Sequence, residues 1–526
     1  MERVEVYDTT LRDGAQGAGV AFSATGALRF AQALAEFGAD YVEGPFAEAR
    51  RGAAEEFYRK AAGLEWGGTE LVAFGSTRRV GVEPGEDPGL VALAEAGTRV
   101  VAVFGKAARR QVETVLQTSP EENLRLVADS VAWLRGKGKR VFFDAEHFFD
   151  GWAADGEYAA AVVRAALEAG AERVVLCDTN GGTLPWVAAE AVRGVAGRFP
   201  EARLGVHAHN DSELAVALTL EAVRAGAGMV QGTFNGYGER AGNANLCSVL
   251  PDLALKMGRE MRCAGNLGRL KGMSRLLDEL LDRRSDPSRP FVGAQAFTHK
   301  AGMHVDAVTK DPASFEHVAP EKVGNTRRIL VSGLSGEDNV RMKAAEFGEE
   351  LARGAPEVAR VLQQLKSMES DGYQFESADG SFRLLVERAM RQRRAFFELR
   401  GFSVMVQKRD AESEAVTIAT IKVAVNGCEE LGAGEGAGPV DALNGALRTV
   451  LRRFYPCLDD VVLEDYHVRI LDPESGTQAV TRVLIESSDG KRHWGTVGVS
   501  ANIIEASWQA LVDSMEYKLL LEERKE

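Results

Sequence analysis

YDTTLRDG, residues Tyr7–Gly14, decides the fold prediction for this sequence. Val4 and Val6 precede it on one face of a predicted strand, and a helical pattern follows at about 23–37. Arg12 and Asp13 therefore fall at a strand end, where α/β barrels place their chemistry. Asp and Gly are also common in an ordinary strand-to-helix turn, so this stretch alone leaves both interpretations open.

A second cluster favours the functional interpretation. GVHAHND, residues Gly205–Asp211, again ends an apolar run and again precedes a helical pattern. His207 and His209 are two residues apart, so on a strand they project to the same side and can bind one divalent ion. Taken alone, two histidines with this spacing also fit buried side chains that are hydrogen-bonded to carbonyl groups. Together with Asp13, the two histidines supply the three protein ligands typical of a catalytic metal with open positions.

Composition narrows the class of protein. At 526 residues we expect two or three domains. The net charge of −14 argues against nucleic acid or an anionic membrane surface as a partner. Five scattered cysteines fit reduced thiols, and no apolar segment reaches the roughly 18 residues that a membrane span requires. These observations predict a soluble, cytoplasmic protein.

Residues 1–265 alternate short β-rich runs with amphipathic helical patterns, such as Tyr158–Ala169 and Glu213–Ala225. There are eight β-rich runs, and their alternation with helical patterns predicts an α/β fold, a closed (β/α)8 TIM barrel. The runs are Arg3–Tyr7, Tyr41–Glu43, Leu71–Phe74, Val100–Phe104, Val141–Asp144, Arg173–Cys177, Leu204–His209 and Met229–Thr233.

Residues 266–400 have a different texture, with charged helical patterns broken by Gly and Pro. We expect helical linker subdomains, with helices at Arg269–Leu281 and Glu337–Lys366 and a loop at Asp282–Gln295.

Residues 401–526 begin with strand-like alternation at Ser403–Lys408 and Val416–Val425. A predicted Gly-rich loop at Gly432–Pro439 follows, then a helix, two further strands and a helix from about Ile503. This order predicts a separate α/β module for ligand binding or association.

Several motifs together resemble a known family. DTTLRDG at Asp8–Gly14, HAHND at His207–Asp211 and GYGERAGN at Gly236–Asn243 resemble the metal-dependent Claisen-condensing barrels that use acyl-CoA. That family includes the 2-isopropylmalate, homocitrate and citramalate synthases and hydroxymethylglutaryl-CoA lyase. AGMHVDAV at Ala301–Val308 resembles its linker motif, and residues 401–526 resemble a regulatory domain that the lyases lack.

Three further stretches are most similar to the citramalate branch, namely Leu71–Arg79, Asp144–Gly151 and Tyr373–Glu376. The resemblance implies that pyruvate and acetyl-CoA condense and that the thioester is hydrolysed to citramalate and CoA. It further implies a place in isoleucine biosynthesis.

The resemblance also implies roles for single residues. Asp13, His207 and His209 would hold the divalent metal, and Asn243 would add an oxygen. Mg²⁺, Mn²⁺, Co²⁺ and Zn²⁺ all fit such a ligand set. Arg12 would stabilise the developing alkoxide, and Thr179 would hydrogen-bond the carboxylate of the 2-oxo acid.

Glu146 is the candidate base for the weakly acidic acetyl methyl group. It lies at a strand end among phenylalanines, which we expect to raise the pKa of its carboxylate; the alternative is a salt-bridged surface glutamate. His304, with Asp306 two residues on, resembles the acid/base histidine of the linker domain. If it serves the partner's site, a homodimer is part of catalysis.

In the last module, Gly434, Gly436, Asp465 and Tyr466 resemble the parts that bind the end product of the pathway. Isoleucine is the inhibitor that this resemblance implies. The alternative is a domain that mainly holds a dimer together.

The chain departs from the family pattern at several positions. Phe315 stands where the synthases usually carry a tyrosine, and Glu213 replaces a glycine. Gly44–Arg50 and Ala107–Ala108 also differ from the usual segments. These changes leave open a larger 2-oxo acid, as in 2-isopropylmalate or homocitrate synthase, or a weakly active barrel that senses an amino acid.

Overall fold

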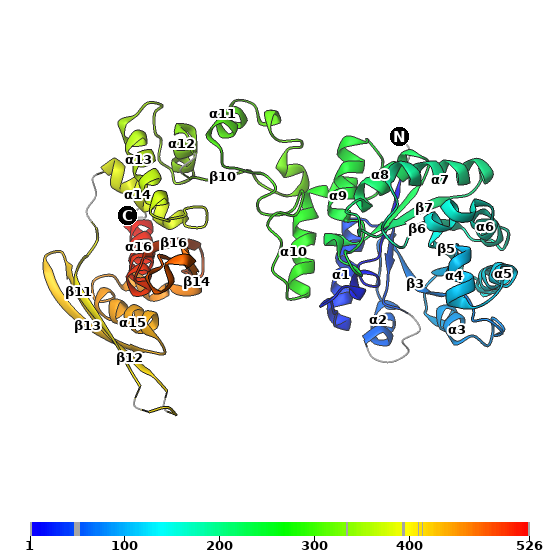
Figure 1. The fold of residues 1–526 in the computed structure, drawn as a ribbon, viewed down its shortest axis with the longest axis horizontal. Coiled ribbons are helices and arrows are strands. Elements are labelled where there is room, and N and C mark those ends of the chain that lie inside the picture. Colours follow the sequence, from blue (N-terminus) through cyan, green and yellow to red (C-terminus); the bar gives the residue numbers. More distant parts are fainter. Residues whose placement is uncertain are drawn as a thin grey trace. The chain divides into compact units, whose positions relative to one another are not determined.

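Eight parallel strands close into a barrel in the computed structural model, which describes residues 3–46, 53–332, 335–391, 395–408, 410–412 and 414–523 (Figure 1). Each strand pairs with the next in chain order, and the eighth closes on the first. The strands are β1 (Glu5–Asp8), β2 (Tyr41–Glu43), β3 (Glu70–Ser76), β4 (Val100–Lys106), β5 (Arg140–Glu146), β6 (Arg173–Asp178), β7 (Leu204–Ala208) and β8 (Met229–Gly232). The predicted TIM barrel is confirmed.

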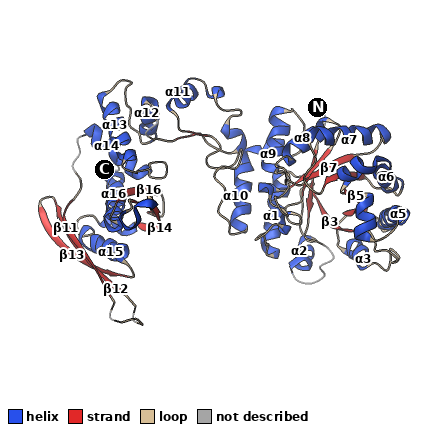
Figure 2. Cartoon of the chain, viewed as in Figure 1, coloured by secondary structure: helices blue, strands red, loops and turns tan. Residues whose placement is uncertain are grey.

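Helices surround these strands (Figure 2). They are α1 (Ala24–Phe37), α2 (Ala53–Ala61), α3 (Pro88–Glu95), α4 (Arg109–Gln111), α5 (Pro120–Gly136), α6 (Phe148–Glu168), α7 (Pro185–Arg198) and α8 (Ala215–Arg224). The side chain of Ser23 caps α1 by accepting from Gly26 N at 3.0 Å. Gly38 ends α1 in the left-handed conformation, φ 101°, which glycine adopts without strain.

The helix α6 begins ten residues before the predicted Tyr158. Its backbone departs from helical geometry at Asp155, φ −151°, and the carboxylate of Asp155 accepts from Tyr158 N at 3.1 Å. The predicted helix at Tyr158–Ala169 is therefore the second part of α6, with a cap of its own. This cap explains why the sequence predicts a helix that begins at Tyr158.

The barrel interior changes character along its axis. Buried apolar and aromatic residues fill its middle, among them Tyr41, Phe142 and Met229. Side chains in a strand face the same way every two residues. Two residues further along the same strands, this face therefore carries the polar side chains Glu43, Asp144 and Gln231, and β7 adds His207. The carboxyl end of the barrel is thus polar although it is buried.

The amino end of the barrel carries ion pairs. Arg173 contacts Glu5 through two hydrogen bonds of 2.8 and 2.9 Å. Arg140 contacts Glu172 through two hydrogen bonds of 2.7 Å. Two parallel N–H···O bonds are the geometry in which arginine binds a carboxylate most strongly.

The first compact unit comprises residues 1–297 and 317–326 and also contains α9 (Leu246–Pro251) and α10 (Leu270–Leu280). The second comprises residues 298–316 and 327–526. The three-domain division at 265 and 400 stays a prediction. No helix in the described part of the chain is long and apolar enough to cross a membrane.

The second unit begins with short strands and helices. They are β9 (Thr298–His299), α11 (Gly302–Lys310), β10 (Arg328–Ile329), α12 (Glu337–Glu346), α13 (Pro356–Ser370) and α14 (Asp379–Arg391). The predicted single helix at Glu337–Lys366 is wrong, because α12 and α13 are separate. Gly348 and Gly354 adopt positive φ angles of 80° and 76°, and Pro356 starts the next helix.

Two antiparallel sheets follow, each of three strands. The elements are β11 (Glu398–Gln407), β12 (Val416–Val425), β13 (Cys428–Gly436), α15 (Pro439–Leu451), β14 (Val462–Ile470), β15 (Thr481–Ser488), β16 (His493–Ser500) and α16 (Ile503–Glu523). Three strands, not the predicted two, come between the last two helices.

The predicted Gly-rich loop at Gly432–Pro439 is also wrong, because β13 extends to Gly436. A Cβ atom at Gly434 would lie 2.4 Å from Ala446 N and 2.5 Å from Ala442 O, both on α15. Glycine recurs in this strand because the helix packs directly on its backbone, not because the chain is a loop.

Candidate metal centre and substrate pocket

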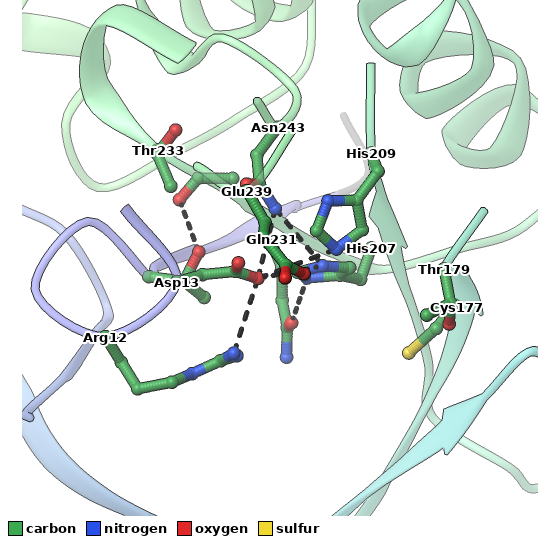
Figure 3. Close-up of polar contacts among 12 residues, drawn as sticks. Arg12, Asp13, Cys177, Thr179, His207, His209, Gln231, Thr233, Glu239 and Asn243 are labelled. Atoms are coloured by element: carbon green, nitrogen blue, oxygen red, sulfur yellow. Dashed lines mark hydrogen bonds and ion pairs between the residues drawn. The ribbon is translucent and has the colours of Figure 1, made fainter. Parts of the chain in front are cut away.

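Three candidate ligands meet at the carboxyl end of the barrel (Figure 3). Asp13 comes from the turn after β1, whereas His207 lies in β7 and His209 directly after it. The Nε2 atoms of His207 and His209 lie 3.2 Å and 3.9 Å from Asp13 Oδ2. All three residues are buried, with exposed fractions of 1, 5 and 7%. Each of the three residues offers one potential ligand atom, and these three atoms lie within 4.8 Å of one another. This spacing suits a single ion.

The cluster holds buried polar atoms that have no hydrogen-bond partner, namely Asp13 Oδ1, His209 Nδ1 and Asn243 Oδ1. Asn243 Nδ2 donates to Asp13 Oδ2 at 3.1 Å and lies 3.3 Å from His207 Nε2. The amide therefore presents its nitrogen to the cluster, and a half-turn of that amide would present the oxygen that we expected. Buried polar atoms are normally satisfied, so these residues fit a bound cation.

The charge states of Asp13 and His209 suit a metal. Burial tends to raise the pKa of Asp13, but the Arg12 guanidinium and His207 outweigh it and hold that pKa well below its usual range. Burial and the neighbouring His207 lower the pKa of His209 to about 4. Asp13 is therefore ionised and His209 neutral near pH 7, as metal ligands must be. Burial tends to lower the pKa of His207, but the Asp13 carboxylate outweighs burial and raises that pKa, so a metal bound there would have to displace a proton.

Arg12 is held from three sides. Its Nε donates to Glu43 Oε2 at 2.7 Å, its Nη1 lies 3.4 Å from Asp13 Oδ2, and its guanidinium lies 3.8 Å from the centre of the Phe74 ring. Glu43 is itself fixed by Tyr7, whose hydroxyl donates to it at 2.8 Å. The guanidinium is thus oriented beside the candidate metal ligands.

A cavity of about 360 Å³ opens above the cluster. It is lined by Arg12, Asp13, Gln16, Phe46, Phe74, Phe104, Asp144, Glu146, Cys177, Thr179, His207, His209 and Glu239. Thr179 Oγ1 accepts from His147 N at 2.8 Å, an arrangement in which the hydroxyl proton can be donated to a ligand. Arg12, Glu146, Thr179 and the metal cluster therefore share one cavity.

Glu146 lines this cavity, but the apolar setting that we expected for it is wrong. Its Oε2 forms an ion pair with Lys106 Nζ, from the end of β4, and its side chain is 22% exposed. The phenylalanines beside it in sequence, such as Phe143 and Phe148, belong to the buried core. Phe143 lies three residues before Glu146 in β5, so its side chain points to the opposite face of the sheet, and Phe148 already belongs to α6.

Phe74 and Phe104 form a stacked pair in the cavity wall, with ring centres 5.4 Å apart. Phe46, from the segment Gly44–Arg50 that departs from the family pattern, also lines the cavity. Residues 47–50 lie outside the described part of the chain.

Comparison with known families gives a consistent result. The family model described as HMGL-like matches residues 3–275. The models described as homocitrate synthase post-HMGL domain-like and LeuA allosteric (dimerisation) domain match residues 291–372 and 376–519.

Relatives cover nearly the whole chain. The (R)-citramalate synthase of Aquifex aeolicus is 46% identical over 99% of this chain and 99% of its own. Those of Geobacter sulfurreducens and Synechocystis sp. are 46% and 48% identical, over 99% and 98% of this chain and 98% and 96% of theirs. The chain belongs to the citramalate synthase family. The resemblance of its motifs to that branch is confirmed.

The remaining candidate acid/base residue of this family member, His304, lies on α11 in the second compact unit. It is exposed and stacks on Phe315, with ring centres 4.2 Å apart. Phe315 is itself 48% exposed. Where the resemblance led us to expect a tyrosine, the chain therefore keeps an aromatic ring against the histidine but has no hydroxyl.

Tyr466 is the one candidate effector residue among those lining a second cavity, of about 460 Å³. This cavity is lined by Val440, Asp441, Asn444, Arg448, Val461, Val462, Leu463 and Tyr466. Asp465 Oδ2 instead contacts His467 Nε2 at 2.9 Å, and Gly434 and Gly436 pack against α15. Their role in effector binding stays a prediction.

Sequence reasoning did not select Lys106, Asp144 or Gln231 as site residues. Asp144 carried a usable signal, because it lies two residues before Glu146 and so faces the same way on β5. Gln231 is a polar residue in the otherwise apolar strand β8, which is a second usable signal. Lys106 had none, since only the pairing of β4 with β5 brings it to Glu146.

Proposed function

We propose that this protein condenses pyruvate with acetyl-CoA and hydrolyses the thioester, giving citramalate and CoA, as a step of isoleucine biosynthesis. The observation that carries the proposal is the buried Asp13–His207–His209 cluster, whose unpartnered atoms adjoin a cavity that also holds Arg12 and Glu146. Full-length similarity to proteins named (R)-citramalate synthase supports the choice of substrates.

Pyruvate binds in the cavity above the cluster. The Thr179 hydroxyl donates to its carboxylate, and the Phe74–Phe104 pair encloses its methyl group. A divalent cation held by Asp13, His207 and His209, with the Asn243 oxygen, supplies Lewis acidity to the ketone when bound. Arg12 stabilises the negative charge that develops on the ketone oxygen, because its guanidinium stays protonated.

Glu146 removes a proton from the acetyl methyl group of acetyl-CoA. The resulting carbanion forms a bond to the ketone carbon of pyruvate, and the ketone oxygen takes up a proton. Water then cleaves the thioester and releases CoA as a thiol. Lys106 holds the Glu146 carboxylate in place at the cavity wall.

His304 is the proposed acid/base group for the proton that reaches the ketone oxygen. Because it lies in the second compact unit, we propose that it is delivered to a barrel in a homodimer. The match of residues 376–519 to a family model described as a dimerisation domain supports this assembly.

The cavity beside Tyr466 is the proposed isoleucine site. Asn444 Oδ1 and Arg448 Nε are buried there with no hydrogen-bond partner, which suits a small polar ligand. Calorimetry with isoleucine is the test, and Tyr466→Ala should weaken both binding and inhibition. Unchanged inhibition in that variant would place the effector elsewhere. A cytoplasmic location is part of the same proposal, supported by the scattered cysteines.

The proposal is tested by CoA-thiol release from acetyl-CoA with metal-loaded protein, comparing pyruvate, 2-oxobutyrate, 2-oxoisovalerate and 2-oxoglutarate. We expect a strong preference for pyruvate. Preference for 2-oxoisovalerate or 2-oxoglutarate would move the activity to that of another synthase. No turnover with any of the four, together with isoleucine binding, would favour an amino-acid sensor.

A further inference from the structure

Gln231 is a fully buried polar residue that bridges a candidate metal ligand and a residue of the cavity wall. Figure 3 shows its side chain beside His207. Gln231 projects from β8, and its Oε1 lies 2.8 Å from His207 Nδ1. Its Nε2 lies 3.4 Å from each carboxylate oxygen of Asp144, which lines the cavity. The two ends of one amide thus contact two different functional side chains.

The chemistry of the amide gives this bridge a direction. An amide nitrogen only donates and an amide oxygen only accepts, so the end beside the Asp144 carboxylate is the donor. The oxygen then faces His207, and Nδ1 must carry the proton that it accepts. The lone pair of the neutral imidazole is consequently on Nε2, the atom 3.2 Å from Asp13 Oδ2.

We propose that Gln231 is a positioning residue that fixes His207 in the Nδ1–H tautomer, so that Nε2 is available to the metal, and ties this ligand to Asp144. Partners of this kind commonly orient metal-bound histidines and raise ligand basicity. The inference rests on the proposed metal site but not on the identity of the 2-oxo acid.

Two substitutions separate the two ends of the amide. Gln231→Met is similar in length but removes both donor and acceptor. Gln231→Glu keeps an acceptor for His207 Nδ1–H and removes the donor to Asp144. We expect Gln231→Met to weaken Mn²⁺ binding by about 10–100-fold, as for loss of other such partners, and Gln231→Glu to bind as tightly as the wild type.

The experiment is calorimetric titration of the full chain with Mn²⁺, accompanied by ¹⁵N-histidine NMR of the Zn²⁺-loaded protein to identify the His207 tautomer. Met229→Leu is the matched control, because Met229 lies two residues earlier on the same face of β8 and is equally buried. This control should retain wild-type affinity, and thermal unfolding of the metal-free variants should reveal any that fail to fold.

Wild-type affinity in folded Gln231→Met would overturn the inference, as would a loss in Gln231→Glu as large as in Gln231→Met. A His207 that retains Nδ1–H in Gln231→Met would also overturn it. If the wild type binds no Mn²⁺, or if His209→Ala binds it equally well, the metal site itself falls and this inference falls with it. The two failures are therefore distinguishable.

Discussion

The two ends of the barrel differ in whether all of their charged side chains are satisfied by one another. At the amino end, Arg173 and Glu5 satisfy each other through two hydrogen bonds, as do Arg140 and Glu172. At the carboxyl end, Asp13 and His209 keep buried atoms that no hydrogen bond satisfies. The difference teaches that mutual satisfaction of charges stabilises a fold, whereas unsatisfied atoms at a rigid edge are available to a ligand.

The largest effect expected is at the carboxyl end. His209→Ala should abolish both turnover and Mn²⁺ binding while the barrel stays folded, because it removes a proposed metal ligand and also removes an unsatisfied buried atom. The checks are CoA release, calorimetry and circular dichroism. Full turnover by the variant would contradict the proposed difference between the two ends, because the unsatisfied atoms at the carboxyl end would then serve no ligand.

Glu146→Gln should lower turnover by about 10²–10⁴-fold, the usual contribution of a positioned base, and leave pyruvate binding intact. The measurement is exchange of the acetyl protons of acetyl-CoA with deuterated water. Lys106→Gln serves as a comparison, because it removes the ion-pair partner but leaves the carboxylate. Unchanged exchange in Glu146→Gln would remove this residue from the proton transfer.

At the amino end the expectation reverses. Arg173→Met should destabilise the fold by about 1–3 kcal/mol, because it leaves the partly buried Glu5 carboxylate without its bidentate partner. The Michaelis constant for pyruvate should be unchanged. Chemical denaturation and steady-state kinetics give the two readouts, and a large change in kinetics without loss of stability would contradict the assignment.

Asp8 sharpens the comparison through pH. Burial raises the pKa of this carboxyl to about 7, against hydrogen bonds from Thr10 that favour its ionised form. Its folded-state pKa is above that of the unfolded chain, so its contribution to stability is present below about pH 4 and is lost as the pH rises to about 7.

The stability advantage of the wild type over Asp8→Asn should therefore shrink by up to about 4 kcal/mol between pH 4 and pH 8. Urea denaturation of both proteins across this range is the measurement. A constant difference would mean that Asp8 titrates alike in the folded and unfolded chains.

Local patterns predicted the barrel, and they predicted that Asp13, His207 and His209 lie together at one end of it. Apolar runs marked all eight strands, and the two-residue spacing of His207 and His209 placed both on one side. Asp13 could be added because every strand of such a barrel ends at the same edge. These features depend on spacing along the chain.

What the sequence could not reveal depends on neighbours far apart in the chain. Lys106 meets Glu146 only because β4 pairs with β5, and Gln231 meets Asp144 only across the closed barrel. The sequence predicts a loop at Gly434, because the packing of this residue against α15 is a tertiary contact that the local pattern does not contain. The interior of Glu337–Lys366 did contain two glycines and a proline, so that break could have been predicted.

The immobilisation of Arg12 has an entropic consequence. A free arginine side chain loses roughly 2 kcal/mol of rotamer entropy when it is ordered. Because Glu43, Asp13 and the Phe74 ring already restrain this guanidinium, that loss accompanies folding rather than ligand binding. A small anion that makes few contacts can therefore bind Arg12 without a further loss of rotamer entropy in this side chain.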